Sequence, residues 1–313
     1  MDLLSELAKP FERMTAAEAS ALLEQNWGIE ATGLTLLDTE RDDTYRVDTA
    51  HGRYVLKVAH PDDDPLYVNL QTAAMSYAAE DPSLPVQSLV LSVEGEVEPT
   101  VSHAGRERIA RVLTWLDGAT IEPGQTFAQF TILGATLARL GEALSTFDHP
   151  AAHRTFAWDL QSLEVIRAHE HPAVADIVFD EFAALDLAAL PHQVIHQDFH
   201  PGNVLVDPRD SRYVVGILDF GDTVYSARVA DLGVAIAYHL PAEGNPRPVL
   251  DAFLQGYESV TPLSDAERDA VPTLIAARLV QRIVLPGIVS NYPYADSVIA
   301  HTTRILDNFL KER

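Results

Sequence analysis

The sequence predicts an α+β protein, with an antiparallel β-sheet in the first third and helices in most of the rest. Segments that alternate apolar and polar residues, separated by tight turns, recur through residues 31–115, on both sides of one helical segment at 66–79. From residue 126 onward, apolar residues recur at intervals of three and four, as in amphipathic helices. A hairpin is expected within this helical part at residues 204–218, where two apolar runs flank a polar turn.

The first part of the chain is expected to begin with helices and to continue as strands. Thr15 followed by Glu18 is a capping-box pattern that favours a helix start. Helices are expected at 5–9, 15–27 and 66–79. Strands are expected at 31–38, 44–49, 53–59 and 108–115, with a hairpin formed by 86–93 and 98–103 around Glu94-Gly95. The last strand ends in Leu116-Asp117-Gly118, which we interpret as a hinge.

The second part is expected to be mostly helical. Residues 126–147 carry a stripe of apolar residues at helical spacing, which is typical of a core helix. Further helices are expected at 160–169, 173–190, 228–240, 248–260, 265–288 and 293–311. Internal repeats and low-complexity segments are absent from the sequence.

The chemistry is expected in the stretch His196-Gln197-Asp198-Phe199-His200-Pro201-Gly202-Asn203 and in Asp219-Phe220-Gly221-Asp222. The predicted hairpin would bring Asn203 near Asp219, and both near Asp198. Two oxygen ligands on adjacent strand ends suit Mg²⁺, which keeps several waters and bridges substrate phosphates. A third carboxylate that does not bind the metal can accept a proton from an attacking hydroxyl.

The spacing of these residues resembles that of known phosphotransferases. His-x-Asp-x4-Asn followed by Asp-Phe-Gly is similar to the catalytic and metal loops of protein kinases. The form His-x-Asp-x-His-Pro-Gly-Asn resembles the aminoglycoside phosphotransferase family, and the polar turn at 40–45 resembles its hydroxylysine-kinase-like and type II homoserine-kinase-like members. The alternative is that His196 and Asp198 cap a turn while Asp219 closes a hairpin, which requires five typed positions to coincide by accident.

The resemblance implies a bilobal protein-kinase-like fold, with an N-lobe at residues 1–116 and a C-lobe at 117–313. It also implies transfer of the γ-phosphoryl group of ATP, with GTP as the alternative donor, to a small-molecule hydroxyl. Asp198 would orient or deprotonate the hydroxyl, while Asn203 and Asp219 would hold one or two Mg²⁺ ions. Supporting roles are implied for His196, His200, Asp222 and Asp231. Of these, Asp231 would hold the catalytic loop through its backbone.

A nucleotide site is implied in the N-lobe. Lys57, on an otherwise apolar strand, would contact the α and β phosphates; the alternative is an edge-strand lysine that reaches water. No Gly-x-Gly-x-x-Gly covers the phosphates, so backbone N–H groups, the Thr44 hydroxyl and Arg41 are candidates instead. Gln71 occupies the place of the glutamate that usually pairs with the lysine. Backbone groups of Thr114 to Leu116 would meet the adenine edge.

The identity of the acceptor is left open by the sequence. Candidate lining residues in the C-lobe are Asp222, Tyr225, Tyr238, His239, Arg282, Asn291 and Tyr292. The polar first turn favours an amino alcohol or a hydroxy amino acid, such as homoserine or hydroxylysine. Aminoglycosides and choline-like compounds are alternatives, as is a nucleotide-binding pseudokinase without turnover. A protein hydroxyl is less favoured, because no Ala-Pro-Glu segment follows Asp219.

Composition narrows the partners and the location. The net charge of −24 argues against nonspecific nucleic-acid binding, which needs Lys and Arg to neutralise phosphates. This charge fits a solvated acidic surface, a salt-rich cytoplasm or an acidic pocket for a cationic substrate. There is no cysteine, hence no disulfide or thiolate site. The first residues lack a secretory apolar core, and no apolar run of about 18 residues is found, so we expect a cytoplasmic protein without a membrane partner. The sequence does not indicate the oligomeric state.

Overall fold

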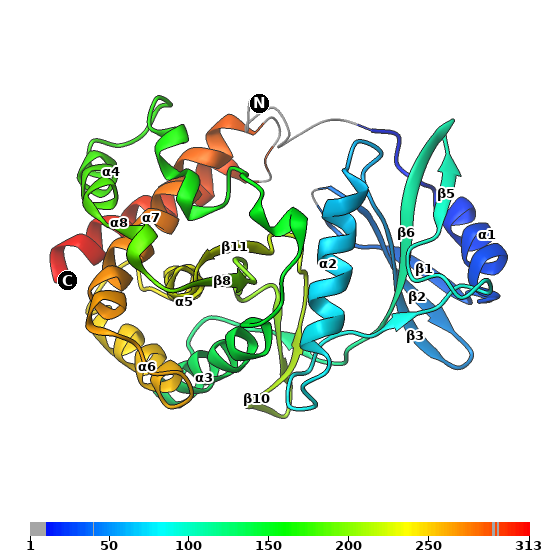
Figure 1. The fold of residues 1–313 in the computed structure, drawn as a ribbon, viewed down its shortest axis with the longest axis horizontal. Helices are drawn as coiled ribbons and strands as arrows, with labels where there is room; N and C mark the ends of the chain where they lie inside the picture. The colour runs from blue at the N-terminus through cyan, green and yellow to red at the C-terminus, as the bar shows by residue number, and fades with distance from the viewer. Residues whose placement is uncertain (1–10, 40, 290–291, 293) are drawn as a thin grey trace.

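The computed structural model describes residues 11–39, 41–289, 292 and 294–313. An antiparallel sheet and a helical region form two lobes, as expected (Figure 1). The sheet has the order β1-β2-β3-β6-β4, and β5 pairs with the other end of β6. Its strands are β1 (Gly33–Leu36), β2 (Asp43–Thr49), β3 (Gly52–Val58), β4 (Leu89–Val90), β5 (Thr100–His103) and β6 (Arg106–Thr114).

Two helices cover the two faces of this sheet. Helix α1 (Ala16–Trp27) packs Leu23 and Trp27 against one face, where Leu56 lies. Helix α2 (Pro65–Ala78) lies between the sheet and the helical lobe (Figure 1), in the same core cluster as Val55. Val55 and Leu56 point to opposite faces because side chains alternate along a strand.

Local signals placed both helices correctly. The Thr15 side chain accepts from the Glu18 N–H, and the Glu18 side chain accepts from the Thr15 N–H, which completes the predicted capping box. Helix α2 begins after Asp64, whose side chain accepts from Leu66 N at 2.9 Å. The helix expected at 5–9 lies outside the described residues.

The hairpin expected between 86–93 and 98–103 is wrong. Both segments pair with β6 instead of with each other: Leu89 lies opposite Leu113, and Thr100 lies opposite Ile109. Strand β6 is nine residues long, so its two ends each accept a short neighbour. The turn around Gly95 is present, with Ser92 N donating to Glu96 O at 2.8 Å, but it joins two strands that lie side by side with β6 rather than with one another.

The helical lobe is built around α7, whose residues Leu274 to Val280 are all buried. Its helices are α3 (Phe127–Leu144), α4 (Val174–Ala184), α5 (Arg228–Ala237), α6 (Arg247–Glu258), α7 (Asp265–Ile288) and α8 (Ala295–Glu312). Helices α3 and α6 cross so closely that a Cβ on Gly134 would overlap the carbonyl of Phe253.

Helix α7 corrects one expectation about apolar segments. Within the described residues it is the one helix long and apolar enough to cross a membrane, with a mean hydropathy of 1.4 over its best window. Of that window, 72% is buried inside the protein. The apolar side chains of α7 therefore form the core of the helical lobe.

Three further elements differ from expectation. The segment expected as a helix at 160–169 is a 3-10 helix, Leu160–Ile166, and α4 ends at Ala184 before a 3-10 turn. A strand was missed: β11 (Val224–Ala227) pairs with β8 (His192–Ile195). The predicted hairpin is confirmed as β9 (Val204–Asp207) and β10 (Asp210–Ile217), and β7 (Ala119–Thr120) pairs with β9.

Candidate active site

The loop after β8 is fixed by a carboxylate from α5. Asp231 is buried, and its two oxygens accept from His196 N at 3.0 Å and from Gln197 N at 2.8 Å. Gln197 has φ of +66°, a left-handed conformation that costs free energy in a non-glycine residue. These two hydrogen bonds hold the backbone in that conformation, which sets the direction of the next residue, Asp198.

The imidazole of His196 lies inside the loop. Its Nδ1 accepts from Asp198 N at 3.2 Å, and its Nε2 lies 3.0 Å from Leu218 O. An accepting Nδ1 requires a protonated Nε2, so the second contact is a donation to the carbonyl. His196 thereby ties the loop after β8 to the end of β10.

Three side chains surround the carboxylate of Asp198. Asn203 Nδ2 donates to Oδ2 at 2.8 Å, and Arg278 Nη2 donates to Oδ1 at 3.0 Å. His200 Nε2 lies 3.4 Å from Oδ2. Burial alone would raise the pKa of Asp198, but the charges of His200 and Arg278 outweigh it and lower the pKa to about 2. Asp198 is therefore ionised at neutral pH.

The hairpin brings Asn203 and Asp219 to one place. Leu218 N donates to Asn203 O at 2.8 Å, which pins the end of β10 to the start of β9. Asp219 has φ of +57°, and its Oδ1 accepts from Gly221 N at 3.0 Å. The charge of Lys57, whose Nζ lies 3.7 Å from Oδ1, holds the pKa of Asp219 below its ordinary value despite burial.

These two residues fit a magnesium ion. The described residues contain no group of three or more His, Asp or Glu in metal-binding geometry, so a closed all-protein site is absent from them. One amide oxygen and one ionised carboxylate match an ion that keeps waters and takes phosphate oxygens as further ligands. The amide nitrogen of Asn203 faces Asp198, which leaves the amide oxygen for a ligand on its other side.

Lys57 lies opposite Thr44 on β2 and Arg111 on β6. Its ion-pair partners within the described residues are Asp219 and Asp42, the latter at 3.6 Å. The contact expected between Gln71 and Lys57 is not among the hydrogen bonds of those residues. Gln71 Oε1 instead accepts from Arg111 Nη1 at 3.1 Å, and Arg111 stands opposite Lys57 on the neighbouring strand.

The expected residues converge on a cavity of about 500 Å³ between the lobes. From the N-terminal lobe it is lined by Arg41, Asp42, Lys57 and Gln71, among others. From the helical lobe it is lined by Asp198, His200, Asn203, Asp219 and Asp222, among others. Burial, and then the neighbouring charge of Asp198, raise the pKa of Asp222.

Three residues expected at the nucleotide do not line this cavity. Thr44 is 5% exposed, and its hydroxyl has no hydrogen-bond partner among the described residues. Thr114 binds the neighbouring strand: its Oγ1 accepts from Ser88 N and its carbonyl accepts from Gln87 Nε2. Leu116 is half-buried after the end of β6.

The candidate acceptor residues divide into two groups. Asp222, Tyr238 and Tyr292 line the cavity. Tyr225 and His239 do not. Tyr225 packs on His153 and His192, while His239 lies against the rings of Phe130 and Phe253, where burial lowers its pKa to about 4.

Arg282 lies beside the cavity rather than in its lining. Its guanidinium lies 4.0 Å from the Tyr238 ring centroid and donates to Ala237 O at 3.3 Å. Tyr238 therefore lines the cavity, and Arg282 lies behind its ring. Asn291 lies outside the described residues.

One buried arginine of the site, Arg278, was not predicted from the sequence. Arg278 is 1% exposed and contacts Asp198, the carbonyl of Trp158 at 3.1 Å and the Tyr238 hydroxyl at 3.3 Å. Arg278 and Arg282 are four residues apart on α7, so they share one face of an otherwise apolar helix. That spacing indicates that both arginines face the same side of α7, but only Arg282 was predicted to line the acceptor site.

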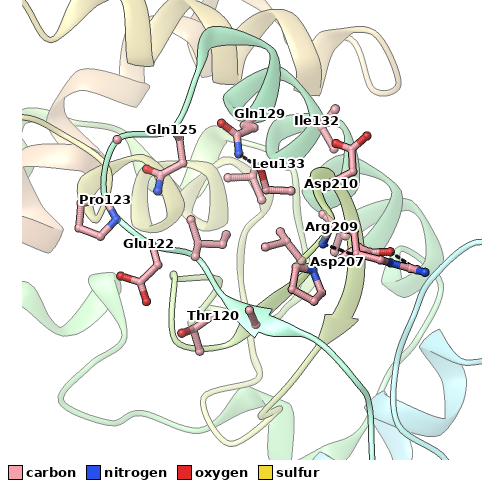
Figure 2. Close-up of a pocket in the computed structure, with 17 residues that line it drawn as sticks. Thr120, Glu122, Pro123, Gln125, Gln129, Ile132, Leu133, Asp207, Arg209 and Asp210 are labelled. Carbon is pink, nitrogen blue, oxygen red and sulfur yellow. Dashed lines mark hydrogen bonds and ion pairs between the residues drawn. The ribbon is translucent and has the colours of Figure 1, made fainter.

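A second cavity, of about 600 Å³, lies in the helical lobe beside the hairpin of β9 and β10 (Figure 2). It is lined by residues 119–125, the start of α3 and the turn between β9 and β10. Figure 2 shows the side chains of Asp207 and Arg209 joined at this turn. Arg209 Nη2 donates to Asp207 Oδ2 at 2.7 Å. None of the residues from the catalytic or metal loops lines it, so the smaller cavity is the candidate active site.

Comparison with known proteins identifies the family of this chain. Residues 34–270 match the phosphotransferase enzyme family, APH. Hydroxylysine kinase of Mus musculus is 29% identical, over 89% of this chain and 82% of that protein. Homoserine kinase of Xanthobacter autotrophicus is 30% identical, over 74% of this chain and 72% of that protein.

A solved structure shares the fold. Amicoumacin kinase in complex with AMP-PNP, Ca²⁺ and Ami has a TM-score of 0.75 and 18% sequence identity, covering 96% of this chain and 94% of its own. The part of the chain that matches the family, residues 34–270, contains the loop after β8, the metal loop and Lys57. The chain therefore belongs to the phosphotransferase enzyme family, and it is a kinase that transfers a phosphoryl group to the hydroxyl of a small molecule.

Proposed function

We propose that this kinase transfers the γ-phosphoryl group of ATP, with Mg²⁺, to the hydroxyl of a hydroxy amino acid or amino alcohol resembling hydroxylysine or homoserine. The observation that carries the proposal is the convergence of Asp198, Asn203, Asp219 and Lys57 on one cavity between the lobes. Phosphoryl transfer depends mainly on positioning and charge neutralisation, and these four side chains are suited to both.

In the proposed reaction the acceptor hydroxyl oxygen attacks the γ-phosphorus. The new O–P bond forms as the bond from the γ-phosphorus to the β,γ-bridging oxygen breaks, and the nucleoside diphosphate leaves. The hydroxyl proton passes to Asp198 and then to solvent. Because the pKa of Asp198 is about 2, its carboxylate first orients the hydroxyl and takes the proton only as the new bond forms.

Asn203 and Asp219 would hold Mg²⁺, which when bound neutralises the phosphate charge. Lys57 would contact the nucleotide phosphates. Thr44 and Arg41 as phosphate neighbours, and backbone groups of Thr114 to Leu116 at the adenine, remain predictions, as does the boundary between lobes at 116 and 117. GTP is the alternative donor. A cytoplasmic location is proposed because the reaction consumes a nucleoside triphosphate.

The acceptor class is proposed from the relatives and from the charges in the cavity. The two curated relatives are named for a hydroxylysine and a homoserine, both hydroxylated amino acids. The cavity presents Asp222 and Arg154 as well as the catalytic charges. An amino acid carries a carboxylate and an ammonium group, so a cavity with charges of both signs suits it. A choline-type cation is recognised by anionic and aromatic groups and has no use for a positive charge in the site.

The test is a comparison of acceptors. Purified protein is supplied with MgATP and, in turn, 5-hydroxylysine, homoserine, choline and an aminoglycoside, while ADP release and product mass are measured. We expect the highest kcat/KM with a hydroxy amino acid. A preference for choline or the aminoglycoside would refute the acceptor class, and nucleotide binding with no ADP release in the presence of any acceptor would support a pseudokinase. Replacing ATP by GTP identifies the donor.

A further inference from the structure

Lys57 lacks the partner that a strand lysine usually has in this fold. Kinases place a glutamate on the helix beside the sheet, and its carboxylate orients the lysine toward the phosphates. Helix α2 carries Gln71 there, which has no charge, and its side-chain oxygen is engaged by Arg111 at 3.1 Å. A different group must therefore orient Lys57 if it is to contact the phosphates.

The turn between β1 and β2 supplies a carboxylate at that position. Asp42 Oδ2 lies 3.6 Å from Lys57 Nζ and 3.7 Å from Arg111 Nη2. The side chains of Asp42 and Lys57 are each 14% exposed, and that of Arg111 is 5% exposed. Attraction between charges in such partly buried surroundings is screened less by salt than on the open surface.

The strand register makes an anion necessary there. Lys57 and Arg111 are directly opposite each other on β3 and β6, so both side chains stand on one face of the sheet. Like charges at opposed positions destabilise a sheet. Asp42 contacts both cations and offsets their repulsion, whereas the other carboxylate near Lys57, that of Asp219, is required for the metal.

The backbone of the turn is held independently of this carboxylate. The Asp42 carbonyl accepts from Arg13 Nη1 at 2.9 Å and from the Thr39 hydroxyl at 2.8 Å. The next residue, Asp43, is buried and paired with Arg108 at 2.8 Å. An amide in place of the Asp42 carboxylate would therefore leave the turn in place and remove only the charge.

We infer that Asp42 is the positioning residue for Lys57, and that the acid comes from the turn between β1 and β2 instead of from α2. This inference rests on the proposed contact of Lys57 with the nucleotide phosphates. Asp42 acts through the lysine and does not itself touch the reacting atoms.

The experiment compares four proteins: wild type, Asp42→Asn, the double variant Asp42→Asn with Gln71→Glu, and Asp48→Asn. Asp48 is the matched control, because it lies on β2 and pairs with Arg46 at 2.9 Å, away from Lys57. The measured quantities are kcat and KM for ATP in ADP release with 5-hydroxylysine or homoserine as acceptor, and the melting temperature.

Asp42→Asn is expected to lower kcat/KM for ATP by about 10²-fold, the usual effect of a misplaced reacting group. Gln71→Glu places a carboxylate beside Arg111, which stands opposite Lys57, so the double variant should recover about tenfold of that loss. Asp48→Asn should stay near wild type. A role limited to structure would lower the melting temperature and would not be repaired from α2.

The inference requires both the loss and the recovery, and the absence of either would overturn it. A lower KM for ATP in Asp42→Asn would also overturn it, since Asp42 would then compete with the phosphates for Lys57. These outcomes presuppose an active wild type. A wild type that releases no ADP with MgATP and either acceptor would contradict the proposed function first, and the role of Asp42 with it.

Discussion

Replacing Arg278 by methionine removes the guanidinium that donates to Asp198 Oδ1, while a side chain of similar length still fills the space. The side chains are 2% exposed for Arg278 and 21% exposed for Asp198, so this ion pair is mostly shielded from water. A hydrogen bond between charged groups contributes about 1.5–3 kcal/mol. Since 1.4 kcal/mol is a factor of ten, kcat/KM should fall about 10- to 150-fold if this contact orients Asp198 for the reaction.

The same substitution should change the pH dependence. The pKa of Asp198 lies below its ordinary value of 3.8, so its charge contributes stability above that value, and this is lost as the pH falls toward 2. Without Arg278 the pKa rises, and the acidic limb of the kcat/KM profile should move to higher pH. The assay is ADP release measured from about pH 3 to pH 8, a range that includes the acidic limb.

The control is Arg268→Met on the same helix. Arg268 is exposed and pairs with Glu258 and Asp265, far from the cavity lining. It should leave both kcat/KM and the profile unchanged. Equal activities and equal profiles for the Arg278 and Arg268 variants would refute the claim that Arg278 orients Asp198.

Three further outcomes are expected. Burial raises the pKa of Asp159 from 3.8 to about 6, so the native state binds a proton that the unfolded chain has released, and stability falls as the pH rises through that window. Asp159→Asn should therefore gain roughly 3 kcal/mol over wild type between about pH 4 and pH 7 in urea unfolding. Gly134→Ala should cost several kcal/mol, about 2–5, because the methyl group meets the Phe253 carbonyl, whereas Gly141→Ala on the same helix should be neutral or stabilising by about 0.5–1 kcal/mol. Lys57→Met should raise the pKa of Asp219 and weaken Mg²⁺-dependent activity below neutral pH, measured by titration with MgCl₂.

Each of these outcomes has a contrary result. A pH-independent difference between Asp159→Asn and wild type would show that Asp159 does not titrate as a buried acid. Equal melting temperatures for the two glycine variants would contradict the close crossing of α3 and α6. An unchanged Mg²⁺ requirement in Lys57→Met would mean that Lys57 does not control the charge on Asp219.

The parts of the site that lie close in sequence were predictable. His196 to Asn203 and Asp219 to Asp222 are separated by a hairpin, and a hairpin requires its two ends to meet. Asp231 follows within a short segment, and its expected contact with the loop backbone is present in the structure. Capping boxes likewise depend on residues three positions apart.

The contacts that were missed join distant parts of the chain. Arg278 lies 80 residues beyond Asp198, and Arg111 lies 40 residues beyond Gln71, so neither pair leaves a local pattern. The pairing of strands is hard to predict for the same reason. The segments around Leu89 and Thr100 looked like a hairpin, but β6 offered each of them a longer partner. Tertiary packing decides such choices, and strand propensity does not.

The most direct test of the central claim is the phosphorylated acceptor itself, detected by mass spectrometry for wild type and for Asp198→Asn. Wild type should form the product with Mg²⁺, lose it in EDTA and regain it when Mg²⁺ is restored. Asp198→Asn should bind AMP-PNP as wild type does but form product about 10²- to 10⁴-fold more slowly, as expected on loss of a general base. Product formed at the wild-type rate by Asp198→Asn, or by wild type without a divalent cation, would contradict the account.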